Sequence, residues 1–194
     1  MRAHDAPPEY PSVTQILRPF FDATYGPIDD GATPYLKRGT YVGDAMDVLV
    51  TGGTISDDWM RWFESHGDWV PYLDAGKKYL RENPPDCIPI VQYRMVDKLQ
   101  KFSGKPDWIF GGKQRRRIFD VKTGTVKPPD WLGLQTGAYA VLAHKEFGVE
   151  FTERGILWLK DTGDYEIIVH DNAMDAHDFL ALLDAEWVKR TRLR

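Results

Sequence analysis

The alternation of hydrophobic and polar positions divides the chain into a helical first part and a mixed second part. Up to Asn83-Pro84-Pro85, apolar side chains recur at the spacing of amphipathic helices, and glycine or proline pairs end the runs. The expected helices run from Ser12 or Thr14 through Phe21, from Pro34 to Val50, from Asp57 or Asp58 through Phe63, and from Trp69 to Leu80. Residues 12–85 are therefore expected to form a helical portion.

Beyond this break the periodicity changes to that of strands. β-Branched and aromatic residues are concentrated in residues 87–95, 102–110 and 116–123, and Gly111-Gly112-Lys113-Gln114 is a hairpin turn signal between the last two. A helix over 132–147, strands over 154–161 and 165–170, and a final helix from Asn172 to about Arg190 complete the order. This order predicts an α/β sandwich with a central mixed β-sheet flanked by helices.

The length and composition fit one globular domain. At 194 residues the chain is expected to be a single domain (1–194), with a loose N-terminal arm over 1–11 and a sheet core over 86–194. Hydrophobic residues make up 42% of the chain, which argues against a disordered protein. The chain shows neither a membrane-length apolar run nor a secretory signal, and its one cysteine, Cys87, suits a reducing compartment, so a cytoplasmic location is expected.

The distribution of charge singles out one basic segment in an acidic protein. The formal net charge is −4, from 25 cations and 29 anions. Residues 98–122 carry +6, because eight cations stand against the two anions Asp107 and Asp120. The cations are Lys98, Lys101, Lys105, Lys113, Arg115, Arg116, Arg117 and Lys122. A local excess of this kind can hold a polyanion such as DNA.

Three short motifs in and after this segment carry candidate chemistry. They are Gly104-Lys105-Pro106-Asp107, Asp120-Val121-Lys122 and the helical pair Gln135 and Tyr139. Side chains alternate along a strand, so Asp120 and Lys122 are expected on one face, and the hairpin can bring Asp107 beside Asp120. Two adjacent carboxylates repel each other unless a cation lies between them, and Mg²⁺ prefers such oxygen ligands. Taken singly, Asp120 and Lys122 would more often be an ion pair, Asp107 a turn residue, and Gln135 and Tyr139 part of an ordinary helix surface.

Beside such an ion, Lys122 has a defined chemical task. Its ammonium can orient an attacking water and offset the negative charge that develops on a phosphoryl group. Gln135 and Tyr139 lie one helical turn apart on the same face, where they can contact a backbone phosphate or the water network next to Lys122. The combination indicates phosphodiester chemistry.

The order Gly-x-Pro-Asp, Asp-x-Lys and Gln-x-x-x-Tyr on strand, strand and helix resembles the PD-(D/E)XK nuclease superfamily, specifically its RecB-like branch with phage-type exonucleases. The resemblance covers residues 11–145 and includes Pro11-Ser12-Val13-Thr14-Gln15-Ile16-Leu17 and Lys37-Arg38-Gly39-Thr40. It implies a restriction-endonuclease-like sandwich and a divalent-metal-dependent DNA nuclease that hydrolyses phosphodiester bonds. The implied setting is DNA recombination, repair or genome processing in a bacterial or phage-infected cell.

The resemblance also implies roles for individual residues. By matching position, Asp107 and Asp120 would bind Mg²⁺ or Mn²⁺, the backbone carbonyl of Val121 would be a further ligand, and Lys122 would assist the water. Single- or double-stranded DNA would be the partner and would contact the helix that carries Gln135 and Tyr139, and a recombination partner protein is conceivable.

Two positions depart from the family's pattern. RecB-like enzymes usually have a metal-binding histidine where this chain has Gly43, and Asp47, Asp44 or a water are the candidates to replace it. Many members also have an acid on the preceding strand, where this chain has Gln92. These departures keep open an alternative, a catalytically impaired nuclease homologue that acts as a nucleic-acid- or protein-binding module. An enzyme acting on a different substrate lacks support, because the chain has neither a P-loop nor a Gly-x-Gly-x-x-Gly motif.

Further DNA contacts are expected around the motifs. Lys105 and the run Arg115-Arg116-Arg117 are candidates for phosphate contacts, although charges at a hairpin tip also protect an edge strand from pairing with other chains. Trp108 and Trp131 flank the expected site and are candidates to stack on an unpaired base, whereas most tryptophans belong to the core.

Overall fold

The computed structural model describes residues 7, 9–26, 34–112 and 115–192. The expected turn residues Lys113 and Gln114, and most of the expected arm over 1–11, lie outside the described residues. The single-domain organisation stays a prediction from the sequence.

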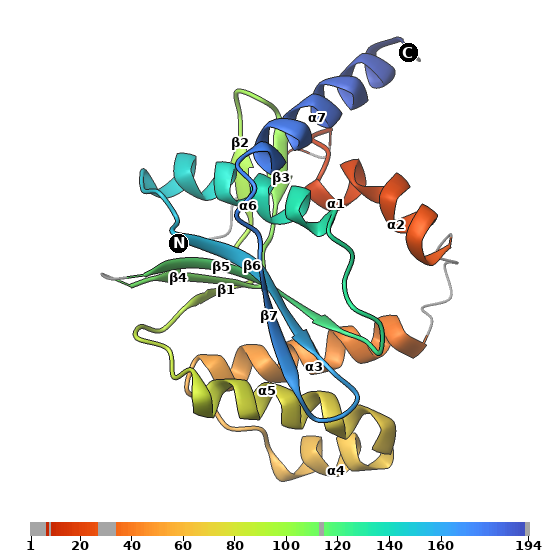
Figure 1. Ribbon diagram of the computed structural model, residues 1–194, viewed down its shortest axis with the longest axis vertical. Helices are drawn as coiled ribbons and strands as arrows, with labels where there is room; N and C mark the ends of the chain where they lie inside the picture. Colours follow the sequence, from red (N-terminus) through yellow and green to blue (C-terminus); the bar gives the residue numbers. More distant parts are fainter. Residues whose placement is uncertain (1–6, 8, 27–33, 113–114, 193–194) are drawn as a thin grey trace.

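A mixed five-stranded β-sheet forms the centre, with the strand order β1-β4-β5-β6-β7 (Figure 1). Its strands are β1 (Ile90–Val91), β4 (Trp108–Gly111), β5 (Arg116–Thr123), β6 (Glu153–Leu159) and β7 (Tyr165–Val169). Strand β5 pairs parallel with β6, and the other neighbours pair antiparallel. A second, two-stranded sheet joins β2 (Met95–Asp97) to β3 (Phe102–Gly104). The predicted α/β fold with a mixed sheet is thus confirmed.

Helices cover both faces of the central sheet. The elements are α1 (Val13–Ile16), α2 (Arg18–Tyr25), α3 (Pro34–Val50), α4 (Asp57–Ser65), a 3-10 turn η1 (Gly67–Trp69), α5 (Val70–Glu82), α6 (Leu132–Phe147) and α7 (Met174–Arg192). Helices α3, α4 and α5 lie on one side, and α1, α2, α6 and α7 lie on the other (Figure 1). The helical N-terminal portion is confirmed as well.

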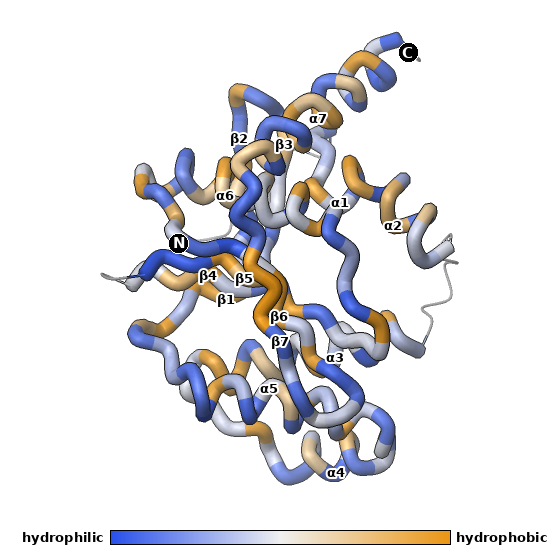
Figure 2. The backbone as a smooth tube through the Cα atoms, in the orientation of Figure 1, coloured by the Kyte–Doolittle hydropathy of each residue, from blue (hydrophilic) through white to orange (hydrophobic). Residues whose placement is uncertain are grey.

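Strand β5 separates two hydrophobic cores because its side chains alternate between the sheet faces. Ile118 is fully buried in the core beneath α6 and α7, whereas Phe119 is buried in the core beneath α3 and α5. The central strands form the most hydrophobic stretch of the backbone trace in Figure 2. By the same alternation, Asp120 and Lys122 lie on the α6 side and Val121 faces the other core, as expected.

Three expected elements differ from the structure, each because of a local residue. The first helix is split in two at Leu17, because Pro19 lacks the N–H that would continue the earlier helix. The strand expected over 102–110 is two strands, β3 and β4, separated by Lys105-Pro106-Asp107. Residues 87–95 contribute only β1 and the first residue of β2, and Gln92 between them has a left-handed φ of 50°.

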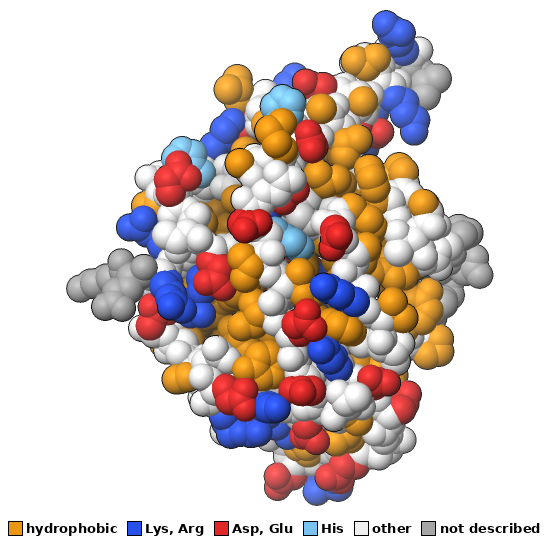
Figure 3. Space-filling view, viewed as in Figure 1, with side chains coloured by type: hydrophobic (Ala, Val, Ile, Leu, Met, Phe, Trp, Pro, Cys, Tyr) orange, Lys and Arg blue, Asp and Glu red, His pale blue; other side chains and the backbone are white. Residues whose placement is uncertain are grey.

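Within the described residues, no helix combines the length and the apolar character that crossing a membrane requires. Figure 3 shows one face, on which acidic and basic side chains are interspersed over α5 and β7.

Close packing of α6 against the start of α7 yields a stability prediction. A Cβ atom on Gly137 would lie 2.9 Å from the backbone nitrogen of Ala176, whereas a Cβ on Gly43 in α3 would meet nothing within 4 Å. We expect Gly137→Ala to destabilise the fold by about 1–3 kcal/mol through overpacking. Gly43→Ala, the matched control, should raise stability by up to roughly 1 kcal/mol through helix propensity. Urea unfolding measures both, and equal effects would contradict the packing argument.

Candidate active site

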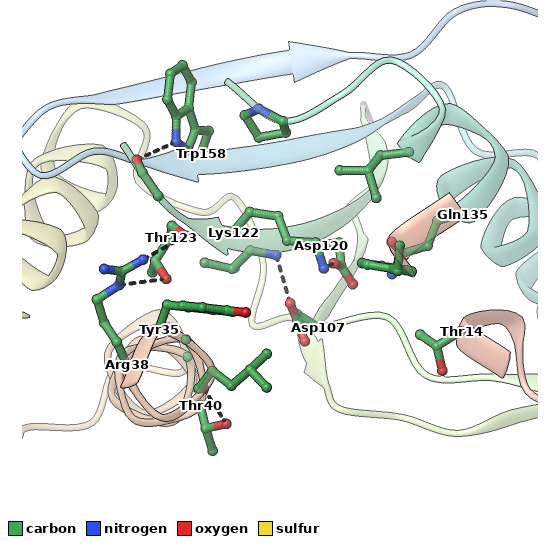
Figure 4. Close-up of a pocket in the computed structure, with 18 of the residues that line it drawn as sticks. Thr14, Tyr35, Arg38, Thr40, Asp107, Asp120, Lys122, Thr123, Gln135 and Trp158 are labelled. Carbon is green, nitrogen blue, oxygen red and sulfur yellow. Dashed lines mark hydrogen bonds and ion pairs between the residues drawn. The ribbon is translucent and has the colours of Figure 1, made fainter. Parts of the chain in front are cut away.

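A pocket of about 940 Å³ lies between α3 and α6. Residues 120–123 of β5 line it, together with Gln92, Asp107 and the loop that follows β5 (Figure 4). Strand β5, helix α6 and strand β6 form a parallel crossover unit, and the pocket lies at the carboxyl end of β5. Ligand sites in α/β folds are commonly found at such strand ends.

The β4–β5 hairpin brings Asp107 next to Asp120, as the sequence predicts. Trp108 pairs with Phe119, so the two aspartates that flank this pair leave the hairpin side by side. The carboxylate of Asp107 accepts hydrogen bonds at both oxygens, from Nε2 of Gln92 at 2.7 Å and from the backbone N–H of Val121 at 2.7 Å. It is therefore held between β1 and β5.

Electrostatics at this point favour a bound cation. Burial, together with the negative charge of Asp120, raises the pKa of Asp107 to about 7. Burial alone would lower the pKa of Lys122, but the charges of Asp120 and Asp107 outweigh burial and raise this pKa. The Lys122 ammonium forms an ion pair with Asp120, so a net negative charge remains on the two carboxylates once Asp107 is ionised as well.

Asp120 is a buried carboxylate of the pocket and is paired with Lys122. The residue is 3% exposed, and its Oδ2 makes the ion pair with the Lys122 ammonium. A buried carboxylate is unfavourable unless it is paired or hydrogen-bonded, and Lys122 supplies that partner. Asp107 and Asp120 together are the kind of oxygen donors that suit a hard divalent ion that keeps several waters.

Gln135 and Tyr139 line the pocket from α6 but are more buried than expected. They are 1% and 2% exposed, and Nε2 of Gln135 donates to the Tyr139 hydroxyl at 2.9 Å. This hydrogen bond leaves Oε1 of Gln135 without a partner among the described residues. A contact of Gln135 with DNA or water could use Oε1 or the second N–H of Nε2, and the predicted DNA contact stays a prediction.

Asp44 and Asp47, the two carboxylates proposed to replace the missing histidine, are placed differently. Asp44 lines the pocket next to Gly43, whereas the Oδ1 oxygen of Asp47 accepts a hydrogen bond from Nε1 of Trp108 at 2.8 Å. In the described part of the chain, no group of three or more His, Cys, Asp or Glu side chains is arranged to hold a metal ion. A third protein carboxylate at the site is therefore not supported by the geometry.

Two of the expected DNA contacts are wrong. Trp108 is fully buried between the sheet and α5, so no base can stack on it. Arg117 is only 11% exposed in its side chain, because it lies over the Phe110 ring at 4.7 Å and pairs with Asp86 at 3.5 Å. Both side chains belong to the α3 and α5 side of the sheet, away from Asp120.

The other candidates for DNA contact stay predictions. Lys105 is exposed and lines the pocket. Arg115 and Arg116 lie at the opposite end of β5, roughly 20 Å along the strand from Lys122 at about 3.3 Å per residue. Trp131 is half-buried, its Nε1 donates to Thr24 at 3.0 Å, and its ring packs against Phe21.

The sequence interpretation missed several residues that line the pocket. Gln92 was recognised only as a neutral substitute for an acid, whereas its left-handed backbone and its hydrogen bond fix Asp107. Arg38 hydrogen-bonds Thr123 at the pocket edge, and only its Arg-Gly-Thr motif marked it. Tyr25 and Tyr35 line the pocket too, and no sequence motif indicates either residue.

Comparisons with known proteins support the fold. No protein-family model and no curated protein matches the chain. A solved structure of a predicted exonuclease from Eubacterium rectale is similar, with a TM-score of 0.56 and 15% identity over 95% of this chain and 80% of that chain. The structure of SSO0001 covers 87% of this chain and 81% of its own at 11% identity, and its TM-score of 0.42 is too low to carry an argument. The first likeness shows a shared fold.

The raised pKa of Asp107 predicts a pH-dependent stability. An acid whose pKa is higher in the folded than in the unfolded protein binds its proton more tightly when folded, so stability falls as pH rises. For Asp107 this loss should occur between its ordinary value of 3.8 and about 7, in protein freed of divalent ions. Asp107→Asn should remove it, so that the melting temperatures of wild type and variant diverge over this window. Parallel curves would contradict the assigned pKa.

Proposed function

We propose that this protein is a divalent-metal-dependent deoxyribonuclease of the PD-(D/E)XK superfamily, related to the RecB-like, phage-type exonucleases. The observation that carries the proposal is the meeting of Asp107 and Asp120 across a hairpin, with Lys122 beside them, inside a pocket. The likeness in fold to the predicted exonuclease of Eubacterium rectale agrees with it. A role in DNA recombination, repair or genome processing would follow from this chemistry.

The residues present fit Mg²⁺ or Mn²⁺. Asp107 and Asp120 would hold the ion, with the Val121 carbonyl as a further ligand. Mg²⁺ in such sites is bound through one or two carboxylates, with water and substrate phosphate as the remaining ligands, so a third carboxylate is not required. When bound, the ion would polarise the phosphoryl group and make a water more acidic.

The chain's own residues would position the substrate and the water. The Lys122 ammonium, held by Asp120, donates hydrogen bonds to the attacking water and offsets charge on the phosphoryl oxygens. The Tyr139 hydroxyl fixes the Gln135 amide, so that Oε1 of Gln135 is available to accept a hydrogen bond from the same water. Exposed Lys105 at the pocket wall attracts the DNA backbone.

Cleavage of labelled DNA tests the proposal directly. Wild type should cut single- or double-stranded DNA with Mg²⁺ or Mn²⁺ and be inactive in EDTA. Asp120→Asn and Lys122→Met should each lower the cleavage rate by about 100-fold or more, since each removes a charge that acts on the transition state. Arg61→Met, an exposed cation of α4 outside both the pocket and residues 98–122, is the control and should leave the rate unchanged. An inactive wild type, or full activity in Asp120→Asn, would refute the proposal.

A second candidate is a non-catalytic module that binds nucleic acid or protein. It is favoured by the Gln92 amide, which occupies one oxygen of Asp107. It is also favoured because, among the described residues, no third His, Cys, Asp or Glu side chain is arranged with the two aspartates to hold a metal ion. Calorimetric titration with Mn²⁺ separates the candidates. Binding that Asp107→Ala abolishes supports the enzyme, whereas salt-dependent DNA binding without any metal effect supports the module.

Replacement of Gly43 by histidine tests whether the site has an open coordination position. Gly43 lines the pocket, and an added Cβ meets no atom within 4 Å, so the imidazole has room. We expect Gly43→His to tighten Mn²⁺ binding by about tenfold or more. Gly43→Ala serves as the control, and calorimetry measures both. Unchanged affinity in Gly43→His would mean that another group already fills the position.

A further inference from the structure

The pocket extends well beyond the carboxylates. Its volume of about 940 Å³ is near the upper end of the roughly 300–1,000 Å³ typical of small-molecule sites, whereas an ion with its waters needs far less. Away from Asp107 and Asp120 the lining includes aromatic and apolar side chains, with Tyr25 from α2, Tyr35 from α3, Leu132 from α6 and Trp158 from β6. This part of the pocket offers apolar surface to a ligand.

Tyr25 and Tyr35 are the exposed aromatic residues of this lining. They are 50% and 45% exposed, whereas Tyr139 in the same pocket is 2% exposed. Neither hydroxyl makes a hydrogen bond within the described residues, and the one ring contact is that of Tyr25 with Phe21 at 6.3 Å. Solvent-exposed aromatic faces in a concave pocket are typical of a binding site.

The two rings share the pocket with the candidate catalytic groups. In Figure 4 the Tyr35 side chain extends from α3 across the pocket towards Asp107 and Lys122. Tyr25 lines the same pocket as Asp107, Asp120 and Lys122. A base stacked on either ring would therefore occupy the pocket that holds the two carboxylates.

We propose that the substrate is single-stranded DNA, whose unpaired bases stack on Tyr25 and Tyr35 while the adjoining phosphate reaches Asp107, Asp120 and Lys122. Bases inside a duplex have both faces covered by their neighbours, and a duplex end offers one free face only, whereas the successive bases of a single strand can each offer a face to a tyrosine ring. The exposed ammonium of Lys105 in the same pocket complements the strand's phosphates. This inference deepens the proposed nuclease function and rests on it for the position of the phosphate.

Binding in EDTA tests this inference without cleavage. Fluorescence anisotropy would compare a labelled single-stranded oligonucleotide with the duplex of the same sequence, for wild type, Tyr25→Ala, Tyr35→Ala and the corresponding Phe variants. We expect wild type to prefer the single strand and each Ala variant to weaken that binding by roughly 10- to 100-fold, because stacking is lost. The Phe variants keep the ring and should bind like wild type.

Tyr41→Ala is the matched control, since Tyr41 is 40% exposed on the same helix as Tyr35 but lies outside the pocket lining. Melting temperatures establish that each variant is folded. Tighter binding of the duplex, or single-strand binding unchanged in both Ala variants, would overturn the inference even if the protein cleaves DNA. Tyrosine-dependent binding of the single strand by a protein that cleaves nothing would support stacking on the two tyrosines but refute the nuclease, and with it the role of the strand as substrate.

Discussion

The structure depends on the antiparallel pairing of β4 with β5, which forces two aspartates together in a buried place. Trp108 and Phe119 pair at the end of this hairpin, and Asp107 and Asp120 follow directly from them. Two negative charges side by side in a buried place repel each other and oppose folding. The chain offsets this cost with a backbone N–H, the Gln92 amide and the Lys122 ammonium, all directed at the two carboxylates. The negative charge that remains when both carboxylates are ionised is the charge that the proposed metal ion would neutralise.

The surrounding architecture follows from where this pair lies in the sheet. Because helices cover both faces of the sheet, the alternating side chains of β5 serve two cores, and Asp120 and Lys122 lie in the carboxyl-terminal half of the strand. The β5–α6–β6 crossover then places α6 over the face of β5 that carries Asp120 and Lys122. On α6, Gln135 donates a hydrogen bond to the Tyr139 hydroxyl. Helix α3 closes the other wall of the pocket. A stable sheet thus carries a pocket at a strand end, which is the usual place for a ligand in this class of fold.

Regular elements were predictable where periodicity and turn residues agree. The bounds of α3, β5 and α6 are those expected, because each combines a clear apolar period with a glycine or proline near its ends. The strand expected over 102–110 failed because Pro106 interrupts pairing within an otherwise strand-like composition. The motif order also predicted that Asp107, Asp120 and Lys122 would meet, since alternation and hairpin pairing are local rules.

The sequence by itself determined the class of fold and the meeting of Asp107, Asp120 and Lys122, because both follow from periodicity and from pairing between neighbouring segments. Only the tertiary structure decided which aromatic and basic side chains face the pocket. Trp108 and Arg117 are buried against the opposite core, whereas Tyr25 and Tyr35 come from α2 and α3 to line the pocket. The physical reason is that the burial of a side chain depends on which distant helix packs over its strand, and such contacts leave no mark on the spacing of residues along the chain.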